Sequence, residues 1–193
     1  NMARFILIDN IENLNKNSVN ALLKVIEEPN ENIFFILINN NEKYILPTLK
    51  SRCLTFKIYL TFDQSMNVSN QLLNANLFDL INHDLISYYN TPGEIINLFN
   101  FSKDKSLDLR DYTLINFLNL LIDNGYYKKN KLVKNLLVNF IELFFLKEYR
   151  LNSSRKSLIK IYQNFVAKIY NTEKFNLDEE SVFLEFKSKL LNG

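Results

Sequence analysis

The sequence is poor in residues that break or cross-link a chain. Its 193 residues include 3 glycines, 3 prolines, no tryptophan, one cysteine (Cys53) and one histidine (His83). So few turn-forming residues favour helices over a β-sandwich or barrel, which needs many turns. The single cysteine excludes a disulfide framework and a thiolate zinc site within these residues, and the single histidine excludes a histidine metal cluster. A nucleophilic dyad or triad would have to use His83.

Excess charge and long apolar runs are also lacking. The formal net charge is +2, which is too small to indicate nucleic-acid binding by itself. Apolar runs such as Ile33–Ile38 are far shorter than a membrane span, and the chain opens without a signal-peptide pattern. We therefore expect a cytoplasmic protein with no membrane partner.

Short apolar runs rich in β-branched and aromatic residues mark the first sixty residues. Phe5–Ile8, Ile33–Ile38 and Leu54–Ile58 read as buried strands. Their apolarity is continuous rather than alternating, which predicts a parallel sheet covered on both faces.

A helix is predicted between the first two strands, because its apolar residues recur with a helical period: Val19, Leu22, Leu23 and Ile26. Asn17 or Ser18 can cap its start, and Pro29 ends it. Strand, helix and strand form a βαβ unit. A further short helix begins at Pro47, which suits a first helical turn.

From Thr61 onward the helical period dominates. The sequence predicts three short helices, a polar linker at 102–106 and four longer helices; the helix ranges are 63–74, 78–89, 92–101, 108–124, 131–150, 154–171 and 178–191. The fold class is therefore α/β followed by all-α. A parallel sheet of so few strands is too small to stand alone, so we expect residues 1–60 to be the end of a larger α/β domain.

One strand ends in an acidic residue, as the Walker B strands of P-loop ATPases do. Phe5–Ile8 is followed by Asp9 and then by Asn10, whose amide cannot act as a base. This pattern alone is weak, because many strands end in a solvated aspartate. No phosphate-binding G-x-x-x-x-G-K-[ST] loop occurs in the sequence.

Two further strings are much more specific. Asn20–Pro29 reads N-A-L-L-K-V-I-E-E-P, and Leu46–Cys53 reads L-P-T-L-K-S-R-C. With the Asp9 strand before them, they resemble the clamp-loader family of AAA+ ATPases, strongly over residues 4–58 and more weakly beyond. The family pattern is a Walker B strand, N-A-L-L-K-x-L-E-E-P, a sensor strand and L-x-x-x-x-S-R-C.

Within that family the chain is most similar to the bacterial DNA polymerase III delta-prime branch. Gamma-type subunits carry a glutamate where this chain has Asn10, and usually threonines where it has Asn39 and Asn40 at the end of the sensor strand. The helix start Pro92–Ile96 also lacks the sensor arginine expected there. The resemblance implies a degenerate Walker B site at Asp9 and Asn10, and a sensor position at Asn40.

Arg52, in the motif Ser51, Arg52, Cys53, is the expected functional residue. In this family the arginine reaches the γ-phosphate of ATP on a neighbouring subunit, where its guanidinium can donate two hydrogen bonds. The alternative is a surface arginine that is paired with a carboxylate. Cys53 is expected to be a small apolar filler rather than a nucleophile.

The resemblance implies a partial AAA+ domain at 1–60, a three-helix lid at 61–103 and a helical collar at 104–193. It implies a non-catalytic subunit that binds no cofactor itself, with ATP and Mg²⁺ held by neighbours. The expected partners are the gamma/tau and delta subunits and, through the complex, the sliding clamp and primed DNA. Two alternatives stay open: an ATP-hydrolysing gamma/tau-type subunit, and a helical interaction module that retains an AAA+ remnant.

A run of lysines precedes and enters the helix at 131–150. Lys128, Lys129, Lys131 and Lys134 could meet DNA phosphates. A solvated loop and helix start is the alternative.

Overall fold

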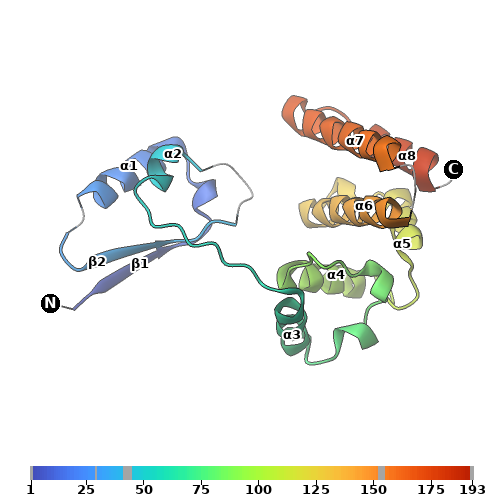
Figure 1. Ribbon diagram of the computed structural model, residues 1–193, viewed down its shortest axis with the longest axis horizontal. Coiled ribbons are helices and arrows are strands. Elements are labelled where there is room, and N and C mark those ends of the chain that lie inside the picture. Colours follow the sequence, from blue (N-terminus) through green and yellow to red (C-terminus); the bar gives the residue numbers. More distant parts are fainter. Residues whose placement is uncertain (1, 29, 41–44, 152–154, 192–193) are drawn as a thin grey trace. The chain divides into compact units, whose positions relative to one another are not determined.

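The computed structural model describes residues 2–28, 30–40, 45–151 and 155–191 (Figure 1). The chain divides into two compact units, Asn1–Tyr59 and Leu60–Gly193. No helix in the described part of the chain is both long enough and apolar enough to cross a membrane. The finer division of residues 61–193 into lid and collar stays a prediction.

The N-terminal unit is built on a pair of parallel strands. Strand β1 (Arg4–Ile8) pairs with β2 (Ile33–Leu37), with Arg4 opposite Ile33 and Ile8 opposite Leu37. Helix α1 (Lys16–Glu27) connects them, so the predicted βαβ unit is confirmed.

The cap of α1 differs from the expectation of Asn17 or Ser18. The cap is Asn15, whose extended backbone lets its side chain accept a hydrogen bond from the Ser18 N–H. The helix therefore begins earlier than its apolar period suggested, because a polar first turn can be helical without contributing to the core. The predicted stop at Pro29 lies outside the described residues.

Helix α2 (Pro47–Lys50) has Pro47 in its first turn, as predicted. Its Leu49 is 1% exposed and packs with Ile11 and Val19 in the small core of this unit. This packing fixes α2 against α1 and so positions the residues that follow it.

The predicted third strand, Leu54–Ile58, is wrong. These residues have no strand structure, and Leu54 and Ile58 are 89% and 90% exposed. A strand needs a neighbouring edge with which to exchange backbone hydrogen bonds, and in the described residues the sheet consists of β1 and β2 alone. An apolar sequence indicates that a segment tends to be buried, but it does not show that a neighbouring strand is available for pairing.

Coverage of the sheet on both faces is also wrong within the described residues. Helices lie against one face, whereas Phe5 and Phe34 stack on the other face at 5.3 Å between ring centroids and are 67% and 52% exposed. A single layer of helices leaves the opposite side chains of each strand in solvent, because successive side chains point to opposite faces.

The C-terminal unit is helical. Its α-helices are α3 (Phe62–Leu73), α4 (Pro92–Asp104), α5 (Leu114–Asp123), α6 (Lys131–Leu151), α7 (Arg155–Phe175) and α8 (Glu180–Phe186). The 3₁₀ turns η2 (Leu77–Asp79), η3 (His83–Leu85) and η4 (Tyr126–Lys128) lie between them, and a π-helical turn, Lys187–Leu191, ends the series. Thr61 and Thr91 form capping boxes with Gln64 and Glu94 at the starts of α3 and α4.

Several predicted boundaries in this unit are wrong. The helix expected at 78–89 is replaced by η2 and η3, because Asn76 and Asn82 accept local backbone hydrogen bonds that favour short turns. The expected linker at 102–106 begins inside α4, where Ser102 bonds to the Phe99 carbonyl and is buried. The helix expected at 108–124 is shortened to α5, whereas the one expected at 178–191 begins at Glu180 and runs through α8 into the π-helical turn that ends at Leu191. Just before it, the Asp178 carboxylate accepts a hydrogen bond of 3.1 Å from the backbone N–H of Glu180.

One hydrophobic core runs through this unit from α3 to α8. Its centre is aromatic: Phe117 and Phe183 are fully buried and make edge-to-face contacts with Phe140 and Tyr127 respectively. Such contacts add about 0.5–1.5 kcal/mol each beyond the area they bury. This core makes the unit a rigid frame for the surfaces it carries.

Candidate functional site

The first candidate site lies where β1 ends. Asp9 is exposed, and its carboxylate accepts a hydrogen bond of 2.8 Å from the backbone N–H of Asn10. Asn10 adopts a left-handed conformation (φ 53°, ψ 50°), which asparagine tolerates better than most residues. The chain thus turns sharply into the 3₁₀ helix η1 (Ile11–Asn13).

The sensor position Asn40 meets this turn. Its side-chain Nδ2 donates a hydrogen bond of 2.5 Å to Oδ1 of Asn10. The carboxyl ends of parallel strands share one edge of a sheet, so residues thirty positions apart come together there. The structure therefore brings two of the residues singled out in the sequence, Asn10 and Asn40, into direct contact.

Glu12 is a member of this site that the motif comparison did not single out. It is 8% exposed, and its Oε1 accepts a hydrogen bond of 3.2 Å from the backbone N–H of Asn40. Its Oε2 is buried and has no hydrogen-bond partner among the described residues. The signal available in the sequence was its position directly after the apolar Ile11, close to the end of the first predicted strand.

The chemistry available at this edge is limited. Amide side chains at positions 10 and 40 can position a ligand but cannot take a proton, and Glu12 is turned into the interior. Among the residues that the structure describes, no group of three or more His, Cys, Asp or Glu side chains could hold a metal ion.

Arg52 lies just after α2 and is held by several local contacts. Its Nη2 is 2.6 Å from Oε1 of Glu27 at the end of α1, and its Nη1 donates to the Thr48 carbonyl at 2.9 Å. The two side chains of the ion pair are 38% and 46% exposed. Arg52 therefore has the surface ion pair that was weighed as the alternative, and its side chain is also partly accessible to solvent.

The neighbours of Arg52 serve its local structure. Ser51 donates its hydroxyl to the Thr48 carbonyl at 3.1 Å, which closes the end of α2. Cys53 packs against the small core, and burial raises the pKa of its thiol. A raised pKa lowers the thiolate fraction, so Cys53 is suited to packing rather than to nucleophilic attack.

Part of the lysine-rich segment is ion-paired. Lys128 Nζ is 2.7 Å from Oε2 of Glu180, and Lys134 bonds to Glu179. Both glutamates lie at the start of α8, so these lysines tie α6 and the turn before it to α8. Their charge is already compensated within the unit, which argues against a dedicated phosphate-binding patch.

Comparison with known proteins shows which proteins the chain resembles. Residues 1–61 match the family model described as DNA polymerase III, delta subunit. The DNA polymerase III subunit delta' of Buchnera aphidicola subsp. Schizaphis graminum is 31% identical over 189 residues, which cover 90% of this chain and 55% of that relative. The chain is a relative of the delta-prime subunits of DNA polymerase III. The resemblance drawn from the motifs is thereby confirmed.

The chain is also similar to gamma and tau subunits of DNA polymerase III. The DNA polymerase III subunit gamma of the same organism is 30% identical over 172 residues, covering 84% of this chain and 42% of that protein. The DNA polymerase III subunit tau of Escherichia coli is 38% identical over 69 residues, covering 35% of this chain and 11% of tau. The chain thus spans about half the length of the Buchnera delta-prime subunit, and a smaller share of the gamma and tau subunits.

Proposed function

We propose that this chain is a non-catalytic, delta-prime-type subunit of the DNA polymerase III clamp loader. In the cytoplasm it would assemble with gamma/tau and delta subunits and help to load the sliding clamp onto primed DNA. It would bind no cofactor of its own, and Arg52 would reach ATP and Mg²⁺ held by a neighbouring subunit. The observation that carries this proposal is the surface position of the Ser-Arg-Cys arginine, since a finger in trans must be accessible.

The polar edge of the sheet supports a non-hydrolytic role. ATP hydrolysis needs a group that orients and activates the attacking water, and Asn10 occupies the position where gamma-type subunits carry a glutamate. The amide of Asn10 is moreover engaged with Asn40. Glu12 cannot substitute, because its carboxylate is buried and one of its oxygens accepts from the Asn40 backbone.

The contacts of Arg52 suit a switch between two anionic partners. An exposed ion pair such as Arg52–Glu27 contributes about 0–1 kcal/mol, so exchanging the Glu27 carboxylate for another anion costs little. A phosphate offers the guanidinium a bidentate, charge-assisted contact that is stronger than the pair it replaces. In the free subunit Glu27 would hold the side chain ready near the surface.

Substitution of Arg52 tests the proposal. In a reconstituted clamp loader, Arg52→Ala should lower DNA-stimulated ATP turnover by about tenfold or more, against roughly 10³–10⁵ for strongly catalytic arginine fingers. Arg52→Lys should restore little of the loss, because an ammonium cannot make the bidentate contact. Assembly, followed by size-exclusion chromatography, should be unchanged.

Lys50→Ala is the matched control, because Lys50 is an exposed cation at the end of α2, two residues before Arg52. It should leave turnover at the wild-type level. A correctly assembled Arg52→Ala complex with unchanged turnover would refute the role in trans.

An ATP-hydrolysing gamma/tau-type subunit is the second candidate, favoured by the 30% identity to a gamma subunit over most of this chain. The two candidates differ in nucleotide binding by the full-length protein. Micromolar ATP affinity in isothermal titration calorimetry, together with hydrolysis by the isolated subunit, would establish the second candidate and exclude the first.

A further inference from the structure

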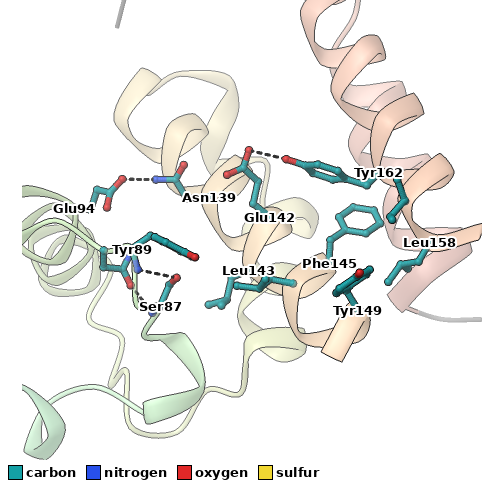
Figure 2. A pocket seen from close by; sticks show the side chains of 13 residues that line it. Ser87, Tyr89, Glu94, Asn139, Glu142, Leu143, Phe145, Tyr149, Leu158 and Tyr162 are labelled. Carbon is teal, nitrogen blue, oxygen red and sulfur yellow. Dashed lines mark hydrogen bonds between the residues drawn. The ribbon is translucent and has the colours of Figure 1, made fainter. Parts of the chain in front are cut away.

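A groove opens within the C-terminal unit between the segment that precedes α4 and the helices α6 and α7 (Figure 2). Its volume is about 380 Å³, within the range of roughly 300–1,000 Å³ that ligand-binding clefts occupy. It belongs to neither the Asn10–Asn40 contact nor the Arg52 site, which lie in the other unit.

The floor of the groove is apolar and partly accessible. It is lined by Leu143, Phe145 and Leu146 of α6 and by Leu158 and Ile159 of α7. Ile159 is 41% exposed. An aliphatic side chain open to solvent beside a buried aromatic core is the kind of surface on which a partner's apolar anchor gains binding energy.

The charged side chains that line the groove are two glutamates, Glu94 and Glu142, among neutral polar residues. Glu94 accepts hydrogen bonds from Asn139 Nδ2 and from the Thr91 N–H, each at 2.8 Å, and Glu142 accepts one of 3.3 Å from the Tyr162 hydroxyl. These donors are all neutral, so they orient the carboxylates without compensating their charge. Among the described residues that line the groove there is no lysine or arginine.

The pKa of Tyr162 reflects the same acidic environment. Burial raises the pKa of its phenol, and the adjacent Glu142 charge and hydrogen bond raise it further. The groove is thus lined here by a neutral hydroxyl and a carboxylate, a combination that favours cations over anions.

We propose that this groove docks a segment of a protein partner in which an apolar side chain is adjacent to a lysine or arginine. The apolar side chain would enter between α6 and α7, and the cation would meet Glu94 or Glu142. Nucleic acid does not fit, because its phosphates would face uncompensated carboxylates. This inference concerns a surface separate from Arg52 and does not depend on the ATP-related role.

Two labelled peptides of opposite charge and equal apolar content test the inference on the full-length protein. Fluorescein-labelled KLFKKLFK should bind in fluorescence anisotropy, and ELFEELFE should bind at least about tenfold more weakly, because complementary charge adds to the shared apolar contact. Replacing both glutamates (Glu94→Gln with Glu142→Gln) should reduce this preference and the salt dependence of binding. Equal binding of the two peptides would overturn the proposal.

A matched pair of substitutions on α7 tests the location. Ile159→Lys should weaken binding of KLFKKLFK by at least about tenfold, which corresponds to a hot-spot contact. Ile161→Lys should leave it unchanged, because Ile161 is equally exposed (42%) on the same helix but does not line the groove. Thermal unfolding followed by circular dichroism should be the same for both variants.

Two results with the Ile159→Lys variant would overturn the proposal. One is full binding by the Ile159→Lys variant. The other is a dimer in analytical ultracentrifugation that Ile159→Lys dissociates, since the groove would then be an interface between copies of this chain.

Discussion

Two charged residues of the N-terminal unit, Arg52 and Glu12, lie in opposite environments. Arg52 shares a solvent-accessible ion pair with Glu27, so its charge can be offered to another partner. Glu12 is buried and has one oxygen bonded to the Asn40 N–H. The first arrangement permits a change of partner, whereas the second fixes the loop that follows β2.

Glu12 is predicted to stabilise the backbone at Asn40. Glu12→Ala removes the acceptor of the Asn40 N–H, and leaving a part-buried donor without a partner costs about 1–2 kcal/mol. Amide exchange at Asn40, followed by NMR, should therefore accelerate by roughly 5- to 30-fold. Glu12→Gln retains an acceptor and should accelerate exchange less. Equal exchange rates in Glu12→Ala and the wild-type protein would contradict this role.

Among the secondary-structure elements, the turn between α5 and η4 depends on one glycine. Gly125 has φ +58°, and a Cβ there would lie 3.3 Å from two carbons of the Lys128 side chain. Gly125→Ala should destabilise the C-terminal unit by roughly 1–2 kcal/mol, the cost of a left-handed residue that carries a Cβ. Urea unfolding followed by circular dichroism measures this change.

Gly93 is the internal control, because it lies in the first turn of α4 with its nearest neighbouring atom, Thr91 Oγ1, at 4.0 Å from a built Cβ. Gly93→Ala should be neutral or stabilising by up to about 1 kcal/mol. If both alanine variants behaved alike, the conformational argument for Gly125 would be wrong.

The turn η3 is joined to two helices through Asp84. Its carboxylate accepts a hydrogen bond of 2.6 Å from the Leu114 N–H at the start of α5, and it pairs with Lys147 of α6. Partial burial opposes ionisation of Asp84, but these hydrogen bonds and the lysine charge outweigh it, so the pKa of Asp84 lies below its ordinary value. Its contribution to stability is therefore present above the unfolded-state pKa of about 3.9 and is lost as pH falls through the lower folded-state pKa.

Asp84→Asn should lower the free energy of unfolding by about 1 kcal/mol at pH 7, a modest value because the side chain is 39% exposed. The difference from the wild-type protein should shrink below pH 4. Urea unfolding at pH 7 and pH 3 measures it, with the exposed Asp79→Asn as control. A difference that persists undiminished at the lower pH would contradict the electrostatic explanation.

For the molecule as a whole, the two units differ in how much core they have. The N-terminal unit has a buried cluster of Ile11, Val19 and Leu49, whereas the core of the C-terminal unit extends from α3 to α8. A two-stranded sheet with an exposed apolar face is marginal, while a helical core rich in aromatic residues is not.

Residues 60–193 expressed alone should consequently fold. We expect a helical circular dichroism spectrum and a cooperative thermal transition for this piece, and no cooperative transition for residues 1–59. A gradual, non-cooperative melt of residues 60–193 would show that their core depends on the rest of the chain.

Prediction from the sequence succeeded where the determining interactions are local. The helical period located α1, α3, α4, α6 and α7 to within a few residues, and the Pro47 rule located α2, because each signal lies within a few turns of chain. The parallel pairing of β1 and β2 was also foreseen from the βαβ spacing. The helix expected at 78–89 failed because asparagine side chains there form turns that compete with the helical hydrogen bonds.

Residue identity and spacing were enough to predict the resemblance to clamp-loader subunits, the motif that contains Arg52 and an amide rather than an acid at position 10. The folded structure was needed to show that Asn40 bonds to Asn10, that Glu12 is buried and that Arg52 pairs with Glu27. It was also needed to show that Leu54–Ile58 forms no strand. Pairing and burial depend on which segments meet across many residues of chain, and no local pattern encodes that geometry.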